Sequence, residues 1–500
     1  MYSHIHLGLI RVGIKSIVLL ALVFLGASAF TGASAGDDRW ADLEPCEISI
    51  AGGRLTAEAQ CGTLQVAENP DASDGRRIEL AFAVAPSRSQ RALADPVVYL
   101  AGGPGQSARE TLPIMQRALR DLNRDRDLIF LDQRGTGGSN ILDCEMGEGE
   151  DMWLETDLAD TSERLKQCME QWDADVRFYT TSHGAADLEK FRAHYEIAAF
   201  NLIGGSYGTR MAQVYLRNYP ERVRSVVLDG VVPTRLHLGS EHGIMLDRAL
   251  QHLFDACRRD SECSERFPGL DSAFAELKAR YNSNSQPIFV THPRTGQGFE
   301  MNFTRDVLAT ALRFLAYSPE SQMMIPYLVH EAAATGSPER LASQALIVTD
   351  QMMDLIAVGL NFAVGCSEDW PDWPEDIDQS TTLLGESLTE VYREICAWWP
   401  TADVADDFHQ PFDSDVPMLI LSGELDPVTP PAYGDEALAQ FSNARHLVAT
   451  GRGHIVLTNP CIGGIATRFI RSADIEDLDT GCMDAIGPEP FFLDLLGPAP

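Results

Sequence analysis

Residues 200–208 read FNLIGGSYG, and residues 209–218 continue with apolar side chains at helical spacing. The four residues before the glycines form a mostly apolar run that is typical of a buried strand. Ser206 therefore lies on a tight turn between a strand and a helix, which is the setting of a nucleophile elbow. Gly204 and Gly208 fit this interpretation, because bulky side chains would clash in so sharp a turn. An ordinary glycine-rich turn would match the same five residues, so the prediction depends on partners elsewhere in the chain.

Short apolar runs alternate with helical patterns on both sides of the elbow. This alternation predicts an α/β fold, with a mostly parallel, doubly wound sheet that carries helices on both faces. An antiparallel hairpin at residues 61–66 and 78–84 comes first. The expected buried strands are residues 97–100, 128–131, 200–203, 225–228, 417–421 and 445–449, and the expected helices are residues 113–122, 185–194, 209–218 and 465–470.

The pattern changes in residues 234–411, where helical spacing dominates and no buried strands alternate with it. This stretch is too long for one crossover connection, so we expect an inserted, mainly helical cap. A single hydrophobic core stops growing near about 250–300 residues, which also favours an insertion in a chain of this length. The α/β core is then divided into residues 36–233 and 412–500. The expected cap helices are residues 246–257, 270–281, 305–317 and 343–363.

Residues 1–35 are typical of a secretory signal peptide. Arg11 and Lys15 precede an apolar core at residues 17–25, which is too short to span a bilayer comfortably. Small residues then allow cleavage after Ala29 or Ala35. We expect a secreted or periplasmic protein without stable membrane association after cleavage; a retained membrane anchor is the alternative.

The chain contains ten cysteines, an even number that fits an oxidising compartment. Their order suggests five local disulfides, although other connectivities remain open from the sequence alone. No C-x-x-C motif occurs in the sequence, which disfavours a zinc or redox site. The neighbouring pairs are Cys46 and Cys61, Cys144 and Cys168, Cys257 and Cys263, Cys366 and Cys396, and Cys461 and Cys482.

The charge balance limits the possible partners. There are 73 acidic against 39 basic residues, which gives a net charge of −34. Such a chain repels polyanions, so we expect no nucleic-acid partner. Solubility is the simplest reason for the excess of acidic residues, and a cationic group such as a peptide N-terminus would also be attracted. The composition, 45% hydrophobic and 22% charged, is that of an ordinary globular protein.

A serine at an elbow needs a base to remove its proton and an acid to orient that base. In a doubly wound hydrolase the chain order is serine, acid, histidine, and each residue follows a strand end. Asp426 and His454 satisfy this order, because each lies in a loop directly after a late apolar strand. His446 begins a strand and is more typical of a structural histidine. We therefore predict that Ser206, Asp426 and His454 form a catalytic triad.

Backbone N–H groups would stabilise the oxyanion of an acyl-transfer reaction. One donor is expected at Tyr207, the residue after the nucleophile. The second should follow an early strand, where residues 102–105 read GGPG, and Gly103 is our choice. An ordinary tight turn is the alternative for this loop.

Two other motifs fail on closer inspection. Residues 132–139 read DQRGTGGS, which lacks both the full G-x-G-x-x-G spacing and the lysine of a P-loop. His330 and Glu331 begin a possible zinc motif, but Ala334 stands where the second histidine would be. We expect no metal and no cofactor.

Five motifs in this order resemble the proline iminopeptidase and tripeptidyl aminopeptidase family of α/β-hydrolases. They are GGPG at 102–105, DQRGTGGS at 132–139, GGSYG at 204–208, GELDPVTP at 423–430 and GH at 453–454. Chain length, the signal sequence and the terminal cysteine pair are closer to the larger, secreted tripeptidyl aminopeptidase branch. One departure is Ala101, where the family usually has histidine, and it puts the packing of the GGPG loop in doubt.

The resemblance implies a secreted serine exopeptidase that releases N-terminal residues or short peptides from peptides with a free N-terminus. How many residues leave at a time is not decided by the sequence. A secreted carboxylesterase or lipase could use the same triad. A binding protein without catalytic activity is a third possibility, against which an intact triad argues.

An exopeptidase must also bind the free α-amine, and carboxylates from the cap are the obvious means. Glu368 and Asp369 are our candidates, because they lie beside Cys366 and a group of tryptophans. Their alternative role is that of solvated surface acids.

Overall fold

The computed structural model describes residues 38–50, 55–72, 74–144, 158–353 and 355–498. These residues belong to one compact unit, Asp37–Pro500. The signal peptide that we predict at residues 1–35 lies outside the described residues. Among the described helices, none combines the length and apolar character that crossing a membrane requires.

A nine-stranded sheet organises the fold, in the order β1-β2-β3-β5-β4-β6-β7-β10-β11. Six neighbouring strands run parallel to one another: β5, β4, β6, β7, β10 and β11. Strands β1, β2 and β3 extend the sheet in antiparallel fashion. The predicted α/β-hydrolase fold with its mostly parallel sheet is confirmed. The strand bounds are β1 Glu44–Ser49, β2 Thr56–Ala67, β3 Arg77–Ala85, β4 Val97–Leu100, β5 Leu128–Leu131, β6 Phe200–Gly205, β7 Val223–Asp229, β10 Met418–Gly423 and β11 Ala444–Ala449.

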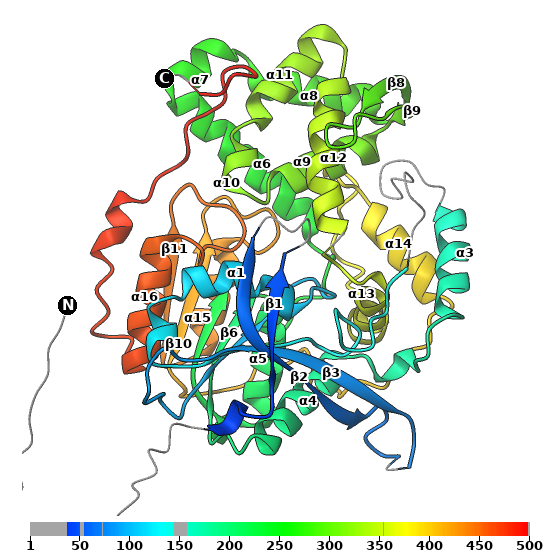
Figure 1. Ribbon diagram of the computed structural model, residues 1–500. Helices are drawn as coiled ribbons and strands as arrows, with labels where there is room; N and C mark the ends of the chain where they lie inside the picture. The colour runs from blue at the N-terminus through cyan, green and yellow to red at the C-terminus, as the bar shows by residue number, and fades with distance from the viewer. Residues whose placement is uncertain (1–37, 51–54, 73, 145–157, 354, 499–500) are drawn as a thin grey trace, which may run out of the picture. The chain divides into compact units, whose positions relative to one another are not determined.

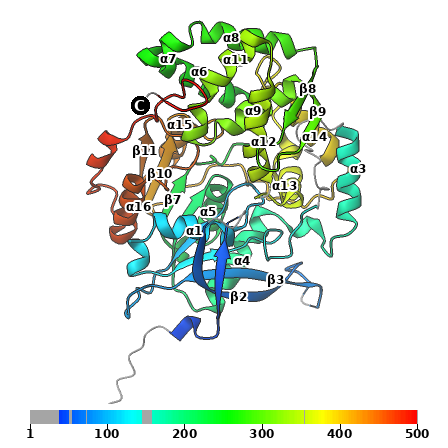
Figure 2. The same cartoon turned by 45° about the horizontal axis from the view of Figure 1, so that its top comes forward.

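Helices cover both faces of this sheet (Figures 1 and 2). Successive residues of a strand point to opposite faces. Accordingly, Leu202 of β6 joins the core that contains α4, α5 and α15, whereas Ile203 joins the core that contains α1 and α16. Both faces are therefore buried, as the apolar strands predict. The helix bounds are α1 Ala108–Ala118, α4 Thr181–His194, α5 Tyr207–Asn218, α15 Pro431–Gln440 and α16 Pro460–Ser472.

A second group of helices lies together beyond one edge of the sheet and shares its own hydrophobic core (Figure 1). It includes a hairpin, β8 and β9, that the helical patterning of the sequence concealed. In β8 the alternate residues Ile288 and Val290 are buried and their neighbours are exposed. Only one face of the strand therefore packs against the helical group. The bounds are α6 His242–Arg259, α7 Ser261–Arg266, α8 Leu270–Tyr281, β8 Gln286–Thr291, β9 Gly298–Phe303, α9 Arg305–Leu315, α10 Pro319–Gln322, α11 Ile325–Thr335 and α12 Glu339–Met353.

The helix expected at residues 343–363 is two helices, α12 and α13 (Val358–Val364). Between them Ile356 forms a bridge with Gln106, and the Ala357 N–H donates to the Gly105 carbonyl oxygen at 3.0 Å. These contacts pull the chain into an extended segment against the GGPG loop. The sequence has no proline or glycine between the two helices. A tertiary contact, and not local propensity, therefore ends the first helix.

Most buried residues of the two helices after this break pack with the sheet, whereas Leu383, Leu384 and Leu388 pack with the helical group. Side chains of α13 and of α14 (Ser387–Cys396) belong to the core that also contains Leu202. The inserted segment therefore has two parts, one with a separate core and one continuous with the core of the sheet. Strand β1 and helix α3 (Leu158–Met169), where the sequence suggests only polar connections, are further elements that lack a strong apolar pattern.

All five expected disulfides form between chain neighbours, as Cys46–Cys61, Cys144–Cys168, Cys257–Cys263, Cys366–Cys396 and Cys461–Cys482. Cys366–Cys396 closes a separation of 30 residues, whereas Cys257–Cys263 closes one of 6. A cross-link stabilises mainly by restricting the unfolded chain, and more so for a longer loop.

Replacing both members of a pair with alanine tests this difference. We expect the Cys366→Ala/Cys396→Ala variant to lose about 3–4 kcal/mol of unfolding free energy. The Cys257→Ala/Cys263→Ala variant, the matched control, should lose about 2 kcal/mol. Denaturant unfolding under oxidising conditions measures both losses. Equal losses would contradict a stabilisation that depends on loop length.

Candidate active site

Ser206 occupies the sharp turn between β6 and α5 with φ 53° and ψ −124°, a positive φ that side-chain-bearing residues rarely adopt. The turn is held from both sides: the Ser206 N–H donates to the Asp229 carbonyl oxygen at 2.8 Å, and the Thr209 N–H donates to the Ser206 carbonyl oxygen at 2.8 Å. A Cβ on Gly204 would lie 2.5 Å from the Gly208 carbonyl oxygen. The predicted strand–turn–helix geometry is therefore present. The strained backbone conformation of Ser206 persists because the surrounding hydrogen bonds and packing hold it in place.

His454 and Asp426 meet in the loops that follow β11 and β10. His454 Nδ1 lies 2.8 Å from Asp426 Oδ2. The N–H groups of Val428 and Thr429 each donate to Asp426 Oδ1 at 2.8 Å, and the Thr429 hydroxyl donates to Oδ2 at 2.8 Å. These donors favour the ionised carboxylate, so His454 carries its neutral-state hydrogen on Nδ1 and leaves Nε2 free to accept a proton.

The electrostatics of the pair follow from this contact. Burial opposes ionisation of Asp426, but the charge and hydrogen bond of His454 outweigh it, and the pKa of Asp426 is lowered. Burial likewise opposes protonation of His454, but Asp426 outweighs it, and the pKa of His454 is raised. The imidazolium that forms when a base takes up a proton is therefore stabilised in place.

Asp229, the last residue of β7, is a site residue that the sequence analysis missed. Its buried carboxylate accepts from the Val456 N–H at 3.0 Å and from the Leu457 N–H at 2.8 Å, two and three residues after His454. Burial raises the pKa of Asp229 to about 6. Its position at a strand end, beside the elbow strand, was the signal that could have identified it.

Residues from the helical group also hold the histidine loop. The His454 N–H donates to the Tyr317 carbonyl oxygen at 2.9 Å, and the two rings pack edge to face with centroids 5.3 Å apart. Gln322 Nε2 donates to the Leu425 carbonyl oxygen at 2.8 Å, next to the acid. Thus the inserted segment positions the loops of both His454 and Asp426.

The GGPG loop lies against the elbow, as expected for an oxyanion site. Gly102 donates its N–H to the Gln106 side chain at 3.2 Å. Gly103 has φ 106°, and Gly103 and Tyr207 line the same cavity as Ser206. The N–H of Tyr207, in the first turn of α5, has no intrahelical partner.

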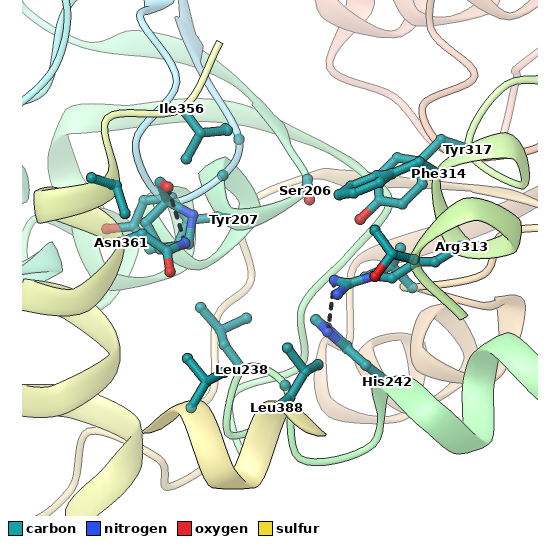
Figure 3. Close-up of a pocket in the computed structure, with 18 of the residues that line it drawn as sticks. Ser206, Tyr207, Leu238, His242, Arg313, Phe314, Tyr317, Ile356, Asn361 and Leu388 are labelled. Atoms are coloured by element: carbon teal, nitrogen blue, oxygen red, sulfur yellow. Dashed lines mark hydrogen bonds between the residues drawn. The ribbon is translucent and has the colours of Figure 1, made fainter. Parts of the chain in front are cut away.

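A cavity of about 790 Å³ joins these parts and lies between the elbow and the inserted segment. Figure 3 shows Ser206 between two walls, with Ile356 and Asn361 on one side and Arg313 and Tyr317 on the other. Ser206 and His454 both line it, and no hydrogen bond joins these two residues in the described part of the chain. Such contacts are often long in free enzymes and tighten when substrate binds.

The structure places Glu368 and Asp369, our predicted amine ligands, away from the cavity. Both carboxylates are buried and absent from the cavity wall. Asp369 accepts two hydrogen bonds from Arg210, at 3.0 and 3.1 Å. Glu368 accepts from the Thr181 N–H at 2.5 Å and from its hydroxyl at 2.7 Å, and burial raises the pKa of Glu368 to about 7. The physical reason is Arg210 on the elbow helix, a partner 159 residues from Asp369 that the local sequence does not reveal.

Two other carboxylates do reach the cavity. Asp306 on α9 and Glu390 on α14 belong to its wall, and the Ser387 hydroxyl donates to Asp306 at 2.6 Å. Asp306, Thr310 and Arg313 are spaced three and four residues apart, so they share one face of α9. The sequence predicted this helix but gave no sign of which face meets the cavity.

An elbow serine beside a histidine–aspartate pair, on a parallel sheet, defines a hydrolase of the α/β type. A family model described as alpha/beta hydrolase fold matches residues 95–459, and the chain belongs to this family.

Curated relatives narrow the comparison. The chain is 24% identical to the tripeptidyl aminopeptidase of Streptomyces coelicolor over 488 residues, with 90% of this chain and 87% of that protein covered. It is 22% identical to the serine protease Hip1 of Mycobacterium tuberculosis over 472 residues, covering 85% and 88%. A shorter match, 29% over 140 residues, links it to the proline iminopeptidase of Xylella fastidiosa, covering 28% and 33%. The predicted family relationship and the prediction of a serine hydrolase are confirmed.

The raised pKa of His454 sets an expectation for pH dependence. Catalysis needs the neutral imidazole, so kcat/KM should fall as pH drops through a pKa above the ordinary value of about 6.5. In Asp426→Asn the carboxylate charge is lost. The acidic limb of the profile of kcat/KM against pH should therefore move to lower pH, and kcat should fall by about 10⁴-fold. Asp435→Asn is the matched control, because Asp435 bonds the structural His446 at 2.9 Å. A limb that stays in place in Asp426→Asn would contradict the assignment.

Proposed function

We propose that the protein is a secreted serine exopeptidase that removes N-terminal residues or short peptides. The observation that carries the proposal is the contact of 2.8 Å between His454 Nδ1 and Asp426 Oδ2, in a cavity that also contains Ser206. The names of the relatives support peptide amides as substrates. The five disulfides support an oxidising compartment.

Ser206, His454 and Asp426 would act in two acyl-transfer steps. His454 Nε2 accepts the Ser206 hydroxyl proton while Oγ attacks the scissile carbonyl carbon, and Asp426 stabilises the imidazolium. The N–H groups of Gly103 and Tyr207 donate to the oxyanion, each contributing roughly 3–4 kcal/mol in comparable sites. His454 then donates its proton to the leaving amine. Water attacks the acyl-enzyme by the same route and restores Ser206.

Asp306 and Glu390 replace the earlier candidates as ligands of the free α-amine. They are carboxylates in the cavity wall, and a negative charge there would attract an ammonium group. Arg313 lies on the cavity wall that faces Ser206. Asp306 is seven residues earlier in the same helix, a distance of about 10 Å along the helix axis. Three extended residues span about the same length, which supports the release of short peptides.

Hydrolysis of esters is the second candidate function. Many side chains of the cavity wall are apolar, among them Leu236, Leu238 and Leu388. An acyl chain would be accepted by such a wall, and the triad chemistry does not distinguish an ester from an amide.

A substrate panel separates the two functions. It contains p-nitroanilides of one to three residues, the same compounds with an acetylated N-terminus, and p-nitrophenyl esters. We expect N-acetylation to lower kcat/KM by about 10–100-fold, the effect of losing a charged hydrogen bond. Ser206→Ala should abolish turnover and also labelling by a fluorophosphonate. Turnover of the esters alone, or amide cleavage that ignores acetylation, would overturn the exopeptidase proposal.

Neutralising the proposed amine ligands tests their role separately. In Asp306→Asn and Glu390→Gln, KM for free N-terminal substrates should rise about tenfold, because a charge-assisted contact becomes neutral. The penalty for N-acetylation should shrink at the same time. Glu394→Gln is the matched control, since Glu394 shares α14 but is absent from the cavity wall. An acetylation penalty that both variants retain in full would assign the amine to other groups.

A further inference from the structure

Arg313 places a guanidinium group in the cavity wall, where no carboxylate of the described chain forms an ion pair with it. This half-buried residue of α9 lines the cavity, and its Nη2 donates to His242 Nδ1 at 3.0 Å (Figure 3). No ion pair with Arg313 forms within the described residues. Arg210 and Arg134, which are also buried, pair instead with Asp369 and Asp187.

His242 orients Arg313 without cancelling its charge. A guanidinium can only donate, so His242 Nδ1 must be the acceptor and its ring hydrogen must lie on Nε2. Burial, together with the charges of Arg313 and His454, holds the pKa of His242 well below its ordinary value. The imidazole is therefore neutral, and the pair carries one net positive charge.

A fixed positive charge is unusual in this setting. The chain has a net charge of −34, and apolar side chains such as Leu238 and Leu388 line the same cavity (Figure 3). A cation that is partly removed from water costs free energy unless an anion pairs with it. The Phe314 ring, 5.9 Å from the guanidinium carbon, offers a weak contact and no negative charge.

The free edge of the guanidinium has the geometry for a carboxylate. His242 takes one of the two Nη2 hydrogens, and Nη1 and Nε form no hydrogen bond among the described residues. The second Nη2 hydrogen therefore still lies parallel to an N–H of Nη1 or of Nε. A guanidinium can bind a carboxylate through two parallel N–H donors, which lysine cannot do. Arg313 also lies on the wall that faces Ser206. It is near enough to His454 for its positive charge to oppose protonation of that imidazole and so to act against the rise in its pKa.

We infer that Arg313, oriented by His242, binds a carboxylate group of the substrate beside the scissile bond. This inference rests on the proposed function and adds a substrate class to it: peptides that combine a free N-terminus with a carboxylate near the cleaved amide. The carboxylate belongs either to an acidic side chain or to the C-terminus of a short peptide. Both sources present the same group to Arg313.

A different role for Arg313 would be to balance the charges of Asp426 and Asp229 around His454. That role predicts an equal effect on all substrates and a displaced pH profile. Binding of a substrate carboxylate predicts an effect that depends on the substrate. The two roles are therefore separable by matched substrates.

The experiment uses two pairs of peptides with free N-termini. One pair differs only by a C-terminal carboxylate or carboxamide, and the other only by glutamate or glutamine next to the cleaved bond. We expect the wild-type enzyme to favour the carboxylate member of one pair by about tenfold or more in kcat/KM, mainly through KM. The pair that responds identifies the source of the carboxylate.

Substitutions at Arg313 complete the test. In Arg313→Gln the preference should fall to about one, and in Arg313→Lys, which keeps the charge but not the fork, it should be intermediate. Arg393→Gln, on the exposed side of α14, is the control and should leave the preference unchanged. Circular dichroism confirms that the variants fold. No preference in the wild-type enzyme for either pair, or an equal loss on both members in Arg313→Gln, would overturn the inference.

Failure of the proposed function has a separate signature, which is the absence of cleavage of any free N-terminal peptide. In that event the p-nitrophenyl monoesters of succinic acid and of its monoamide replace the peptides. A preference for the succinate ester that Arg313→Gln removes would retain the carboxylate site in an esterase. Equal turnover of the two esters by the wild-type enzyme would remove it.

Discussion

The hydrogen bonds of Asp229 connect the two loops on which the site depends. Its backbone carbonyl accepts from the Ser206 N–H, and its carboxylate accepts from the N–H groups of Val456 and Leu457 in the His454 loop. One residue at the end of β7 thus holds both the strained turn at Ser206 and the His454 loop. Because neighbouring parallel strands end at one edge of the sheet, a single residue can contact one loop through its backbone and the other through its side chain. The Asp426 loop is held by its own short turn and by the Gln322 side chain.

Much of this arrangement could be predicted from the sequence, because it is encoded locally. Glycines around Ser206, an apolar run before each loop and the order of Ser206, Asp426 and His454 are all visible in the chain itself. The parallel sheet brings strand ends together without any knowledge of side-chain contacts. Prediction of the fold and of these three residues therefore required turn chemistry and topology alone.

The parts that could not be predicted depend on contacts between distant residues. Glu368 and Asp369 are adjacent to tryptophans in sequence, but their environment is determined by Arg210 on another element. The break near Ile356 follows from the loop at Gln106, some 250 residues earlier in the chain. Similarly, a helical pattern shows that α9 has a buried face but not that Asp306 and Arg313 meet a cavity. Composition and periodicity carry no record of which surfaces meet.

The bond between the His454 N–H and the Tyr317 carbonyl oxygen has a consequence for how such enzymes diversify. The segment that shapes the cavity also supports the loops of His454 and Asp426, through Tyr317 and through Gln322. Specificity and catalysis are thus not separate modules in this chain. A cap transplanted from a relative would need to reproduce these two attachments, one from the Tyr317 backbone and one from the Gln322 side chain, even if every substrate contact were correct. Variation in substrate choice is consequently easier on the far side of the cavity, where side chains can change while the attachments stay in place.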